Sequence, residues 1–319
     1  MEFRNYTMFL VTGALAYDYI LAFPGKFSDH ILPEKIHVIN ISCVVDKVDR
    51  HFGGTGGNQA YTLGLLGMNP LILGAAGKDF GPYDEYLRSA GVDTQWIRYA
   101  DDYLTTMGYA LFDKSNNQIW GFAKNAMKKA KDLRIAMVKP KASFVLITPD
   151  DYDAISQYIV ECNTLKIPYA FDPAFDIPQL TVEVLTQGVE GAEVVFGNDY
   201  EIAQLMDRCS MTHESLVKDK IVITTLGEKG SLVEYNDQKY EIPVAKPKKL
   251  ENPSGAGDAY RSGFLAGYKR GFELPVCGRM GAVAASYAIE NNGTIEHKFT
   301  LKEFSKRYEE NFSQSLLLQ

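Results

Sequence analysis

Short apolar runs alternate with longer amphipathic stretches over the second half of the chain. The apolar runs have the length and composition of buried strands and lie at residues 144–148, 169–172, 194–196 and 221–225. Helix-like stretches are found at residues 152–165, 182–188 and 200–206, and three more close the chain at 256–270, 274–289 and 300–308. This alternation predicts a mainly parallel sheet with helices on both faces, an α/β protein of three layers, α/β/α.

The first half of the chain predicts two further strands of that sheet. A buried strand at residues 8–11 ends in the turn-prone pair Thr12-Gly13. A second run at 71–73 is followed by four small residues and by a helix over roughly 83–90. Both strands therefore fit the same α/β pattern.

A second, smaller sheet is predicted from the remaining strand-like segments. Residues 36–48 are rich in β-branched side chains, which predicts one or two strands. Runs at 104–112 and 118–122 flank a polar Asp-Lys-Ser-Asn-Asn turn typical of a hairpin. A small sheet that covers a binding site is a lid. We expect one domain over residues 1–319, with a lid formed by the inserted segments 15–52 and 103–123.

Composition and charge narrow the class of protein. The chain has 319 residues, of which 46% are hydrophobic, enough for one large domain with a sizeable core. A net charge of −7 argues against nucleic-acid binding, which needs a basic face. The four cysteines form no C-x-x-C pair, so we expect neither a zinc site nor disulfides. We find no signal peptide and no membrane-spanning run, and a cytoplasmic protein without membrane partners is expected.

The stretch Glu251 to Tyr260 combines a helix start, small side chains and a carboxylate. Pro253 suits the entry to a helix, and Ser254 is an N-cap residue type. The N–H groups of the first turn stay accessible to an anion because small residues follow, Gly255, Ala256 and Gly257. This turn is therefore a candidate phosphate site.

Asp258 lies just inside that turn. A carboxylate is a poor phosphate ligand because like charges repel, but it suits the removal of a proton from a hydroxyl that attacks phosphate. The alternative is packing, since Ala259, Gly263 and Gly267 recur every four residues and describe a stripe of small side chains. Both interpretations stay open for this stretch by itself.

A second glycine cluster runs from Phe52 to Asn58. Asn58 is a natural N-cap for the helix that follows, and Gly67 is a natural stop. The dinucleotide fingerprint fails because Gln59 stands where its third glycine should be. No P-loop motif occurs in the chain, so any use of ATP must proceed without one.

Polar residues follow several predicted strands, where ligands of parallel sheets bind. Asp18 lies between two tyrosines, as in sites that hold sugar hydroxyls, although it could also be a solvated acid. Asn198 and Glu201 form a capping-box pattern, or else a site for a magnesium-bound water. A tight turn or a phosphate contact fits the segment with Thr225, Gly227 and Gly230.

The order of these motifs resembles the ribokinase-like (PfkB) family of sugar and nucleoside kinases, from Gly13 to about Gly293. The most specific motif is Gly255-Ala256-Gly257-Asp258. Segments of the substrate half resemble in particular the bacterial adenosine/nucleoside kinase branch: Ala16-Tyr17-Asp18, Phe23-Pro24-Gly25 and Gly57-Asn58-Gln59-Ala60-Tyr61. The chain departs from the family pattern at Asn252-Pro253-Ser254, where an acidic residue usually comes first.

The resemblance implies a ribokinase-like fold and ATP-dependent phosphorylation of the 5′-hydroxyl of a ribonucleoside in purine salvage, with adenosine as the first candidate. Asp258 would take the 5′-hydroxyl proton, while the N–H groups of Gly255, Ala256 and Gly257 would stabilise the transferred phosphoryl group. The ribose 2′- and 3′-hydroxyls would be held by Asp18 and Asn58, with Gly54 giving backbone access.

For the second substrate, the resemblance implies ATP with Mg²⁺, and K⁺ as a candidate activator. Thr225, Gly227 and Gly230 would face the ATP phosphates. Asn198 and Glu201 would order magnesium and its water.

Two rival functions remain open. One is a sugar kinase acting on ribose, fructose or a similar sugar. The other is a catalytically silent protein that binds a nucleoside or sugar. A nucleoside needs an apolar slot for its base, with Phe112, Trp120 and Phe122 of the lid as candidates. The exposed edges of a lid sheet could also pair two subunits as a homodimer.

Overall fold

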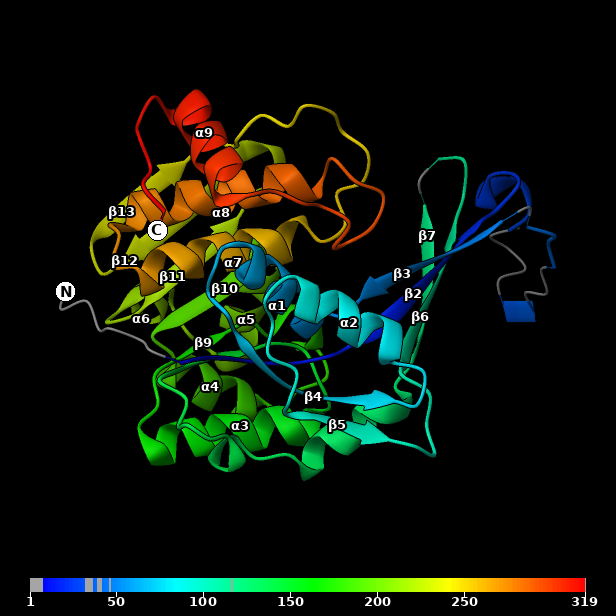
Figure 1. The fold of residues 1–319 in the computed structure, drawn as a ribbon, viewed down its shortest axis with the longest axis horizontal. Helices are drawn as coiled ribbons and strands as arrows, with labels where there is room; N and C mark the ends of the chain where they lie inside the picture. Colours follow the sequence, from blue (N-terminus) through cyan, green and yellow to red (C-terminus); the bar gives the residue numbers. More distant parts are fainter. Residues whose placement is uncertain (1–7, 32–36, 39–41, 46, 116, 319) are drawn as a thin grey trace.

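The computed structural model describes residues 8–31, 37–38, 42–45, 47–115 and 117–318. Two sheets organise this part of the chain: a nine-stranded sheet between two helical layers, and a four-stranded sheet that projects from one side (Figure 1). Within the described residues, no helix is long and apolar enough to cross a membrane.

The large sheet is mainly parallel, as the sequence predicts. Its strand order is β13-β12-β11-β10-β9-β8-β1-β4-β5, and only β12 and β13 pair antiparallel to their neighbours. The strands are β1 (Phe9–Thr12), β4 (Leu71–Gly77), β5 (Ile97–Ala100), β8 (Phe144–Ile147), β9 (Tyr169–Phe171), β10 (Val194–Asn198), β11 (Ile221–Thr225), β12 (Ser231–Tyr235) and β13 (Gln238–Ile242).

The helices cover the two faces of this sheet and bury separate apolar clusters. One face carries α1 (Thr55–Leu65), α2 (Gly81–Ser89), α7 (Ala256–Lys269), α8 (Leu274–Ala288) and α9 (Leu301–Phe312). The other carries α3 (Tyr152–Leu165), α4 (Val182–Gly191), α5 (Asp199–Cys209) and α6 (His213–Val217). Short 3₁₀ helices are η1 (Phe27–Asp29), η3 (Asn125–Asp132), η4 (Ile135–Met137), η5 (Ala174–Asp176) and η6 (Gly227–Lys229).

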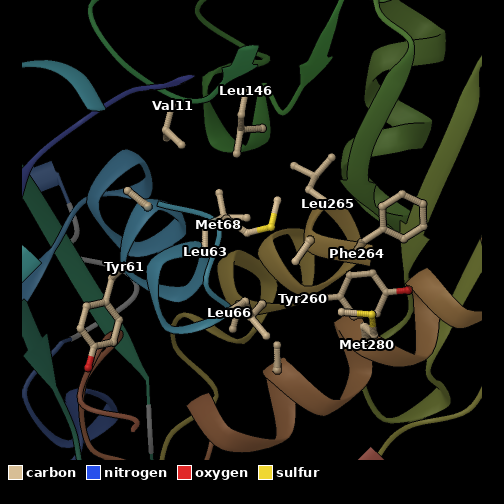
Figure 2. Packing of buried hydrophobic residues seen from close by; sticks show 14 of the residues in the cluster. Val11, Tyr61, Leu63, Leu66, Met68, Leu146, Tyr260, Phe264, Leu265 and Met280 are labelled. Carbon is tan, nitrogen blue, oxygen red and sulfur yellow. The ribbon is translucent and has the colours of Figure 1, made fainter. Parts of the chain in front are cut away.

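Helices α1, α7 and α8 pack closely in the first cluster. Figure 2 shows Leu63 of α1, Leu265 of α7 and Met280 of α8 within this cluster. A Cβ atom on Gly263 would lie 2.5 Å from the Met280 carbonyl oxygen. The predicted stripe of small residues therefore exists, and it lets α7 approach the backbone of α8.

The small sheet has the order β3-β2-β6-β7 and contains the predicted hairpin. Its strands are β2 (Ala16–Ala22), β3 (Val48–Gly53), β6 (Thr106–Phe112) and β7 (Gln118–Ala123). The prediction of strands over 36–48 is wrong for the described residues 37–38, 42–45 and 47, which lie outside the strands. Strand β3 begins at Val48 because that residue pairs with Leu21 of β2. A partner strand determines where a strand lies more strongly than a high density of β-branched residues does.

Several element boundaries also differ from the predictions, and three of them concern small or capping residues that the sequence analysis singled out. The small residues after Leu73 continue β4 to Gly77. Asn58 is not an N-cap, because Gly54, with φ of 85°, caps α1 and places Asn58 inside the first turns. Ser254 is likewise not the cap of α7, since Gly255 adopts φ of 79° and takes that position. Glycine reaches this left-handed region without strain, and its backbone geometry overrides the side-chain preference for capping. The predicted stop at Gly67 is confirmed, with φ of 71° just past the end of α1.

Candidate active site

The polar residues expected at the site gather at the carboxyl edge of the large sheet. Strand β1 lies between β8 and β4, and beyond its end the chain passes into β2 of the small sheet. The Thr148 hydroxyl donates to the Thr12 carbonyl at 2.8 Å and joins the ends of β8 and β1. A change of direction in strand order at such an edge opens a crevice in which ligands of α/β sheets bind.

The first turn of α7 borders this crevice. Gly255 is required there twice, by its φ of 79° and because a Cβ atom would lie 2.7 Å from the Thr294 carbonyl oxygen. The Asn252 side chain accepts a hydrogen bond from the Ser254 N–H at 2.9 Å and stabilises the loop before the helix. The Ala256 N–H, expected to face an anion, also makes a turn hydrogen bond of 3.2 Å with the Pro253 carbonyl.

Asp258 in this turn accepts hydrogen bonds from two amides of α1. Asn58 Nδ2 donates to Oδ2 at 2.8 Å, and Gln59 Nε2 donates to Oδ1 at 3.1 Å. Burial raises the pKa of Asp258, while the positive charge of Arg261 and the two amide contacts lower it in part. A buried carboxylate held by donors on both oxygens has the fixed orientation and raised basicity of a general base.

The Asn58 side chain links Asp258 to the chain beyond α8. Its Oδ1 accepts a hydrogen bond from the Thr294 hydroxyl at 2.9 Å, and that hydroxyl lies 3.0 Å from the Phe52 carbonyl. Both ends of the Asn58 amide thus have protein partners, so its orientation is determined.

Asp18 lies within β2, where two glycines make room for its carboxylate. Gly53 of β3 and Gly108 of β6 flank it, and a Cβ atom on either would collide with the Asp18 carboxylate. Burial raises the pKa of Asp18 to about 6, with His51 lowering it and Asp258 raising it. Asp18 and Asp258 are therefore close enough to influence each other's charge across the crevice.

His51 stands opposite Asp18 in the strand register. Its Nδ1 lies 3.2 Å from Glu296 Oε1, and no described residue hydrogen-bonds to its buried Nε2. No sequence pattern singles out His51, because the residue that pairs with it across the sheet is known only once the strands are aligned.

Asn198 and Glu201 form a complete capping box at the start of α5. The Glu201 N–H donates to Asn198 Oδ1, and the Asn198 N–H donates to Glu201 Oε2, both at 2.8 Å. The structural interpretation of this motif is therefore confirmed. Asn198 also pairs with Thr225 in the sheet, so the motif lies beside the segment expected to face ATP.

A cavity of about 520 Å³ extends from that segment to the first turn of α7. Five residues expected at the site line this cavity. Two come from the first turn of α7, Ala256 and Gly257, and three from the segment after β11, Thr225, Gly227 and Gly230. Its other walls are mainly apolar and include Val244, Ala245, Leu250, Ala282, Ala285 and Ile289. The lining thus combines small polar turns with apolar side chains, the two kinds of contact that the phosphates and the base of a nucleotide need.

The lid strands carry aromatic rings in the row of Asp18. Phe122 pairs with Gly108, which pairs with Asp18. Phe122 stacks on Trp120 with ring centroids 5.5 Å apart, and on Phe175 of η5 at 6.1 Å. Phe175 was not expected at the site, and it joins the lid to the large sheet.

A magnesium ion fits this edge only if its other ligands come from water and phosphate. Among the described residues, no group of three or more His, Cys, Asp or Glu side chains could hold a metal. Glu201 Oε2 is engaged by Asn198, which leaves Oε1 as the oxygen that would accept from a metal-bound water. Mg²⁺ commonly keeps several waters and binds through substrate phosphates with one or two carboxylates nearby, so the residues fit.

Three side chains near Asp258 were not selected from the sequence, Gln59, Asp172 and Arg261. Asp172 could be recognised only as a polar residue after a strand. Arg261 carries a weak signal, since a position three residues after Asp258 lies on the same side of α7. Their mutual contacts join α1, β9 and α7, which no local pattern relates.

Comparisons with known proteins agree with this architecture. Residues 26–300 match the family described as pfkB family carbohydrate kinase. A nucleoside kinase of Methanocaldococcus jannaschii is 30% identical over 82% of this chain and 86% of its own length. Its crystal structure, described as an archaeal member of the ribokinase family, covers 96% of this chain and 100% of that chain with a TM-score of 0.85 at 28% identity.

A second solved relative is the nucleoside kinase of Burkholderia thailandensis. Its complex with inosine has a TM-score of 0.88 at 28% identity and covers 97% of this chain and 100% of that chain. Its complex with ADP-inosine has a TM-score of 0.85 at 30% identity, with 96% and 97% covered. The predicted ribokinase-like fold is confirmed.

Proposed function

The chain belongs to the pfkB family of carbohydrate kinases, whose members transfer phosphoryl groups to alcohols, and we propose that it phosphorylates the 5′-hydroxyl of a ribonucleoside with ATP. The observation that carries the proposal is the Asp258 carboxylate, held by Asn58 and Gln59 in the same turn of α7 whose Ala256 and Gly257 line the nucleotide-sized cavity. The relatives named above are nucleoside kinases, which favours a nucleoside over a free sugar.

Adenosine is the first substrate candidate, and other purine nucleosides follow. The sequence segments around Asp18 and Asn58 support this order, and the complex of the Burkholderia relative with inosine supports the wider class. The nucleoside base would stack beside Phe122 and Phe175, whose rings are 61% and 59% exposed. Large exposed aromatic rings next to a sugar-binding acid suit a purine.

In the substrate half, Asp18 would accept hydrogen bonds from the ribose hydroxyls. Asn58 would contact the same hydroxyls from α1, next to the backbone of Gly54. Gly54 has a second, structural reason to be glycine, since a Cβ atom would lie 2.5 Å from the Ala14 carbonyl oxygen.

For ATP, the apolar end of the cavity would receive adenine, and Thr225, Gly227 and Gly230 would face the phosphates. Magnesium, held by those phosphates and by a water on Glu201, would neutralise charge on the transferred group. Asn198 orients Glu201 through the capping box. K⁺ remains a candidate activator near the loop of Asn252.

The chemical step follows from these positions. Asp258 accepts the proton of the 5′-hydroxyl as its oxygen attacks the γ-phosphorus of ATP, the bond to the β,γ-bridging oxygen breaks, and ADP leaves. The N–H groups of Gly255, Ala256 and Gly257, at the positive end of α7, stabilise the negative charge on the transferred group.

A substrate panel tests the proposal. Purified protein with ATP and Mg²⁺ is offered adenosine, inosine, guanosine, cytidine, ribose and fructose, and ADP formation is measured. We expect turnover with one or more nucleosides and weak or no turnover with free sugars. Activity on free sugars alone would show that the rival sugar-kinase function is correct, and binding without ADP formation would favour the silent binding protein.

A further inference from the structure

A buried arginine joins three carboxylates behind the first turn of α7. Arg261 Nε lies 2.8 Å from Asp172 Oδ2, and Arg261 Nη2 lies 3.5 Å from Glu201 Oε2. Its positive charge also acts on Asp258, three residues earlier on the same helix. Elements β9, α5 and α7 therefore meet at one guanidinium group.

Gln59 closes this cluster from the opposite side. Its Nε2 donates to Asp172 Oδ2 at 2.7 Å and to Asp258 Oδ1 at 3.1 Å. The Gln59 and Asp172 side chains are fully buried, and Arg261 is 7% exposed. One amide thus bridges the base to a carboxylate that never reaches solvent.

The Arg261 guanidinium also supports the anion-binding turn. A Cβ atom on Gly257 would lie 2.5 Å from Arg261 Nη1, so the cation lies directly against the turn. The turn that carries Asp258 and the guanidinium group therefore hold each other in a fixed relative position.

The charge balance of the cluster requires such a cation. Burial raises the pKa of Asp172 to about 7, although Arg261 lowers it. Without Arg261, ionised Asp258 would face Asp172 and Glu201 with no opposing charge, and Asp258 would hold its proton more tightly.

We propose that Arg261, Asp172 and Gln59 form a positioning network that orients the Asp258 carboxylate and couples it to the Glu201 side of the site. The inference rests on the proposed kinase function and concerns the chemical step, since none of the three side chains is placed against a substrate. The network acts through Asp258, and loss of a member lowers kcat more than it raises KM.

The first test measures kcat and KM for both substrates in Arg261→Gln and Gln59→Met. We expect kcat to fall by about 10- to 100-fold, as for small misplacements of a catalytic group, with KM little changed. Arg261→Lys, which keeps the charge, should recover part of the loss. The control is Arg270→Gln at the C-cap of α7, where the arginine donates to the carbonyls of Leu66 and Ala266 away from the site.

Arg261→Gln leaves the buried Asp172 carboxylate without its cation, although Gln59 still donates to it, and the variant could fail to fold. The double variant Asp172→Asn with Arg261→Gln removes both charges together, so that Asp172 is not left as a buried charge without its cation. Circular dichroism establishes which variants fold, and the double variant is expected to fold and to show the same loss of kcat.

Two further readouts separate positioning from a structural role. Adding Arg261→Gln to Asp258→Asn should cause no further loss, because a network that acts through Asp258 has nothing left to orient. The acid limb of kcat should move to higher pH in Arg261→Gln, because the cation that lowers the pKa of Asp258 is gone. The groups that face Asp258 are Arg261 on α7, Glu201 on α5, Asp172 after β9, Asp18 on β2 and Tyr83 on α2.

Unchanged kcat in the folded variants, or a full additional loss in the Asp258→Asn background, would overturn the network while leaving the proposed function intact. A wild-type protein without activity on any nucleoside or sugar would instead overturn the proposed function, and the network with it.

Discussion

Asp258 is the only acidic residue in the first turn of α7, and its carboxylate accepts hydrogen bonds from two side-chain amides. Asp258→Asn keeps the size of the side chain and removes its ability to accept a proton. We expect nucleoside binding to persist and kcat to fall by about 10²- to 10⁴-fold, the usual contribution of a positioned base. Calorimetry measures the binding, and ADP release measures the turnover. Asp207→Asn, an exposed position on α5, is the control, and near-normal turnover of Asp258→Asn would refute the mechanism.

Asp18 provides a prediction on pH. Its pKa, raised to about 6 by burial, means that the carboxylate becomes protonated as the pH falls through 6. Charge-assisted hydrogen bonds to the ribose hydroxyls are then lost, so nucleoside binding should weaken below pH 6. Calorimetric titration without ATP between pH 5 and pH 8 isolates this effect from catalysis. The Asp18→Asn variant should bind the nucleoside more weakly, and its affinity should depend little on pH. If the nucleoside affinity of the wild-type protein did not change between pH 5 and pH 8, the role of Asp18 would be contradicted.

At the scale of single residues, the site could be predicted from the sequence where its functional residues are adjacent in the chain. Asp258 and its glycines are adjacent, so their motif could be recognised directly. The contacts of Asp258 with Asn58 and Gln59 span about 200 residues of chain and depend on how α1 packs against α7. The preference of asparagine for helix N-caps predicted Asn58 as the cap of α1, because such a preference takes no account of the residues packed around the helix end.

At the scale of elements, Gly263 determines how closely α7 approaches α8. Gly263→Ala adds a methyl group 2.5 Å from the Met280 carbonyl oxygen, and backbone cannot yield as a flexible side chain can. The alanine gains up to about 1 kcal/mol of helix propensity, whereas overpacking costs about 1–3 kcal/mol. We expect a net loss of stability, measured by urea denaturation.

Gly81→Ala is the matched control for this prediction. It lies in the first turn of α2, and a Cβ atom there meets nothing within 4 Å. Its stability should stay equal to that of the wild type or rise. A Gly263→Ala protein as stable as Gly81→Ala would show that α8 can move away from α7 without cost.

Most central strands of the large sheet and the helices beside them were predicted because each has a strong periodic pattern of its own, whereas the edge strands β5 and β13 were not predicted. The helix over residues 152–165 coincides with α3, and the strand over 221–225 with β11. The lid was less predictable, since a strand such as β3 has one β-branched residue and exists through pairing with β2. Strand pairing between distant segments is a property of the tertiary fold.

At the scale of the whole molecule, the lid presents an apolar face opposite Asp18. Tyr19 and Tyr109 stack there with ring centroids 5.2 Å apart. A hollow of about 600 Å³ on this side includes Leu21, Leu111 and Ile119 in its lining. Tyr109 and Ile119 are 46% and 52% exposed, an unusual density of apolar surface on a projecting sheet.

We therefore expect the lid faces of two copies to pack together as a homodimer, which would bury these apolar side chains. Sedimentation velocity of the wild-type protein should show a dimer. Ile119→Lys, which places a charge in the contact, should shift the equilibrium to the monomer, because an unpaired charge is costly in an apolar interface. Val160→Lys, at an apolar position of α3 that is 49% exposed, should leave the dimer intact. A wild-type protein that is monomeric at all concentrations would contradict the lid contact. If Ile119→Lys and Val160→Lys dissociated the dimer equally, the effect of the added charge would not depend on its position in the lid.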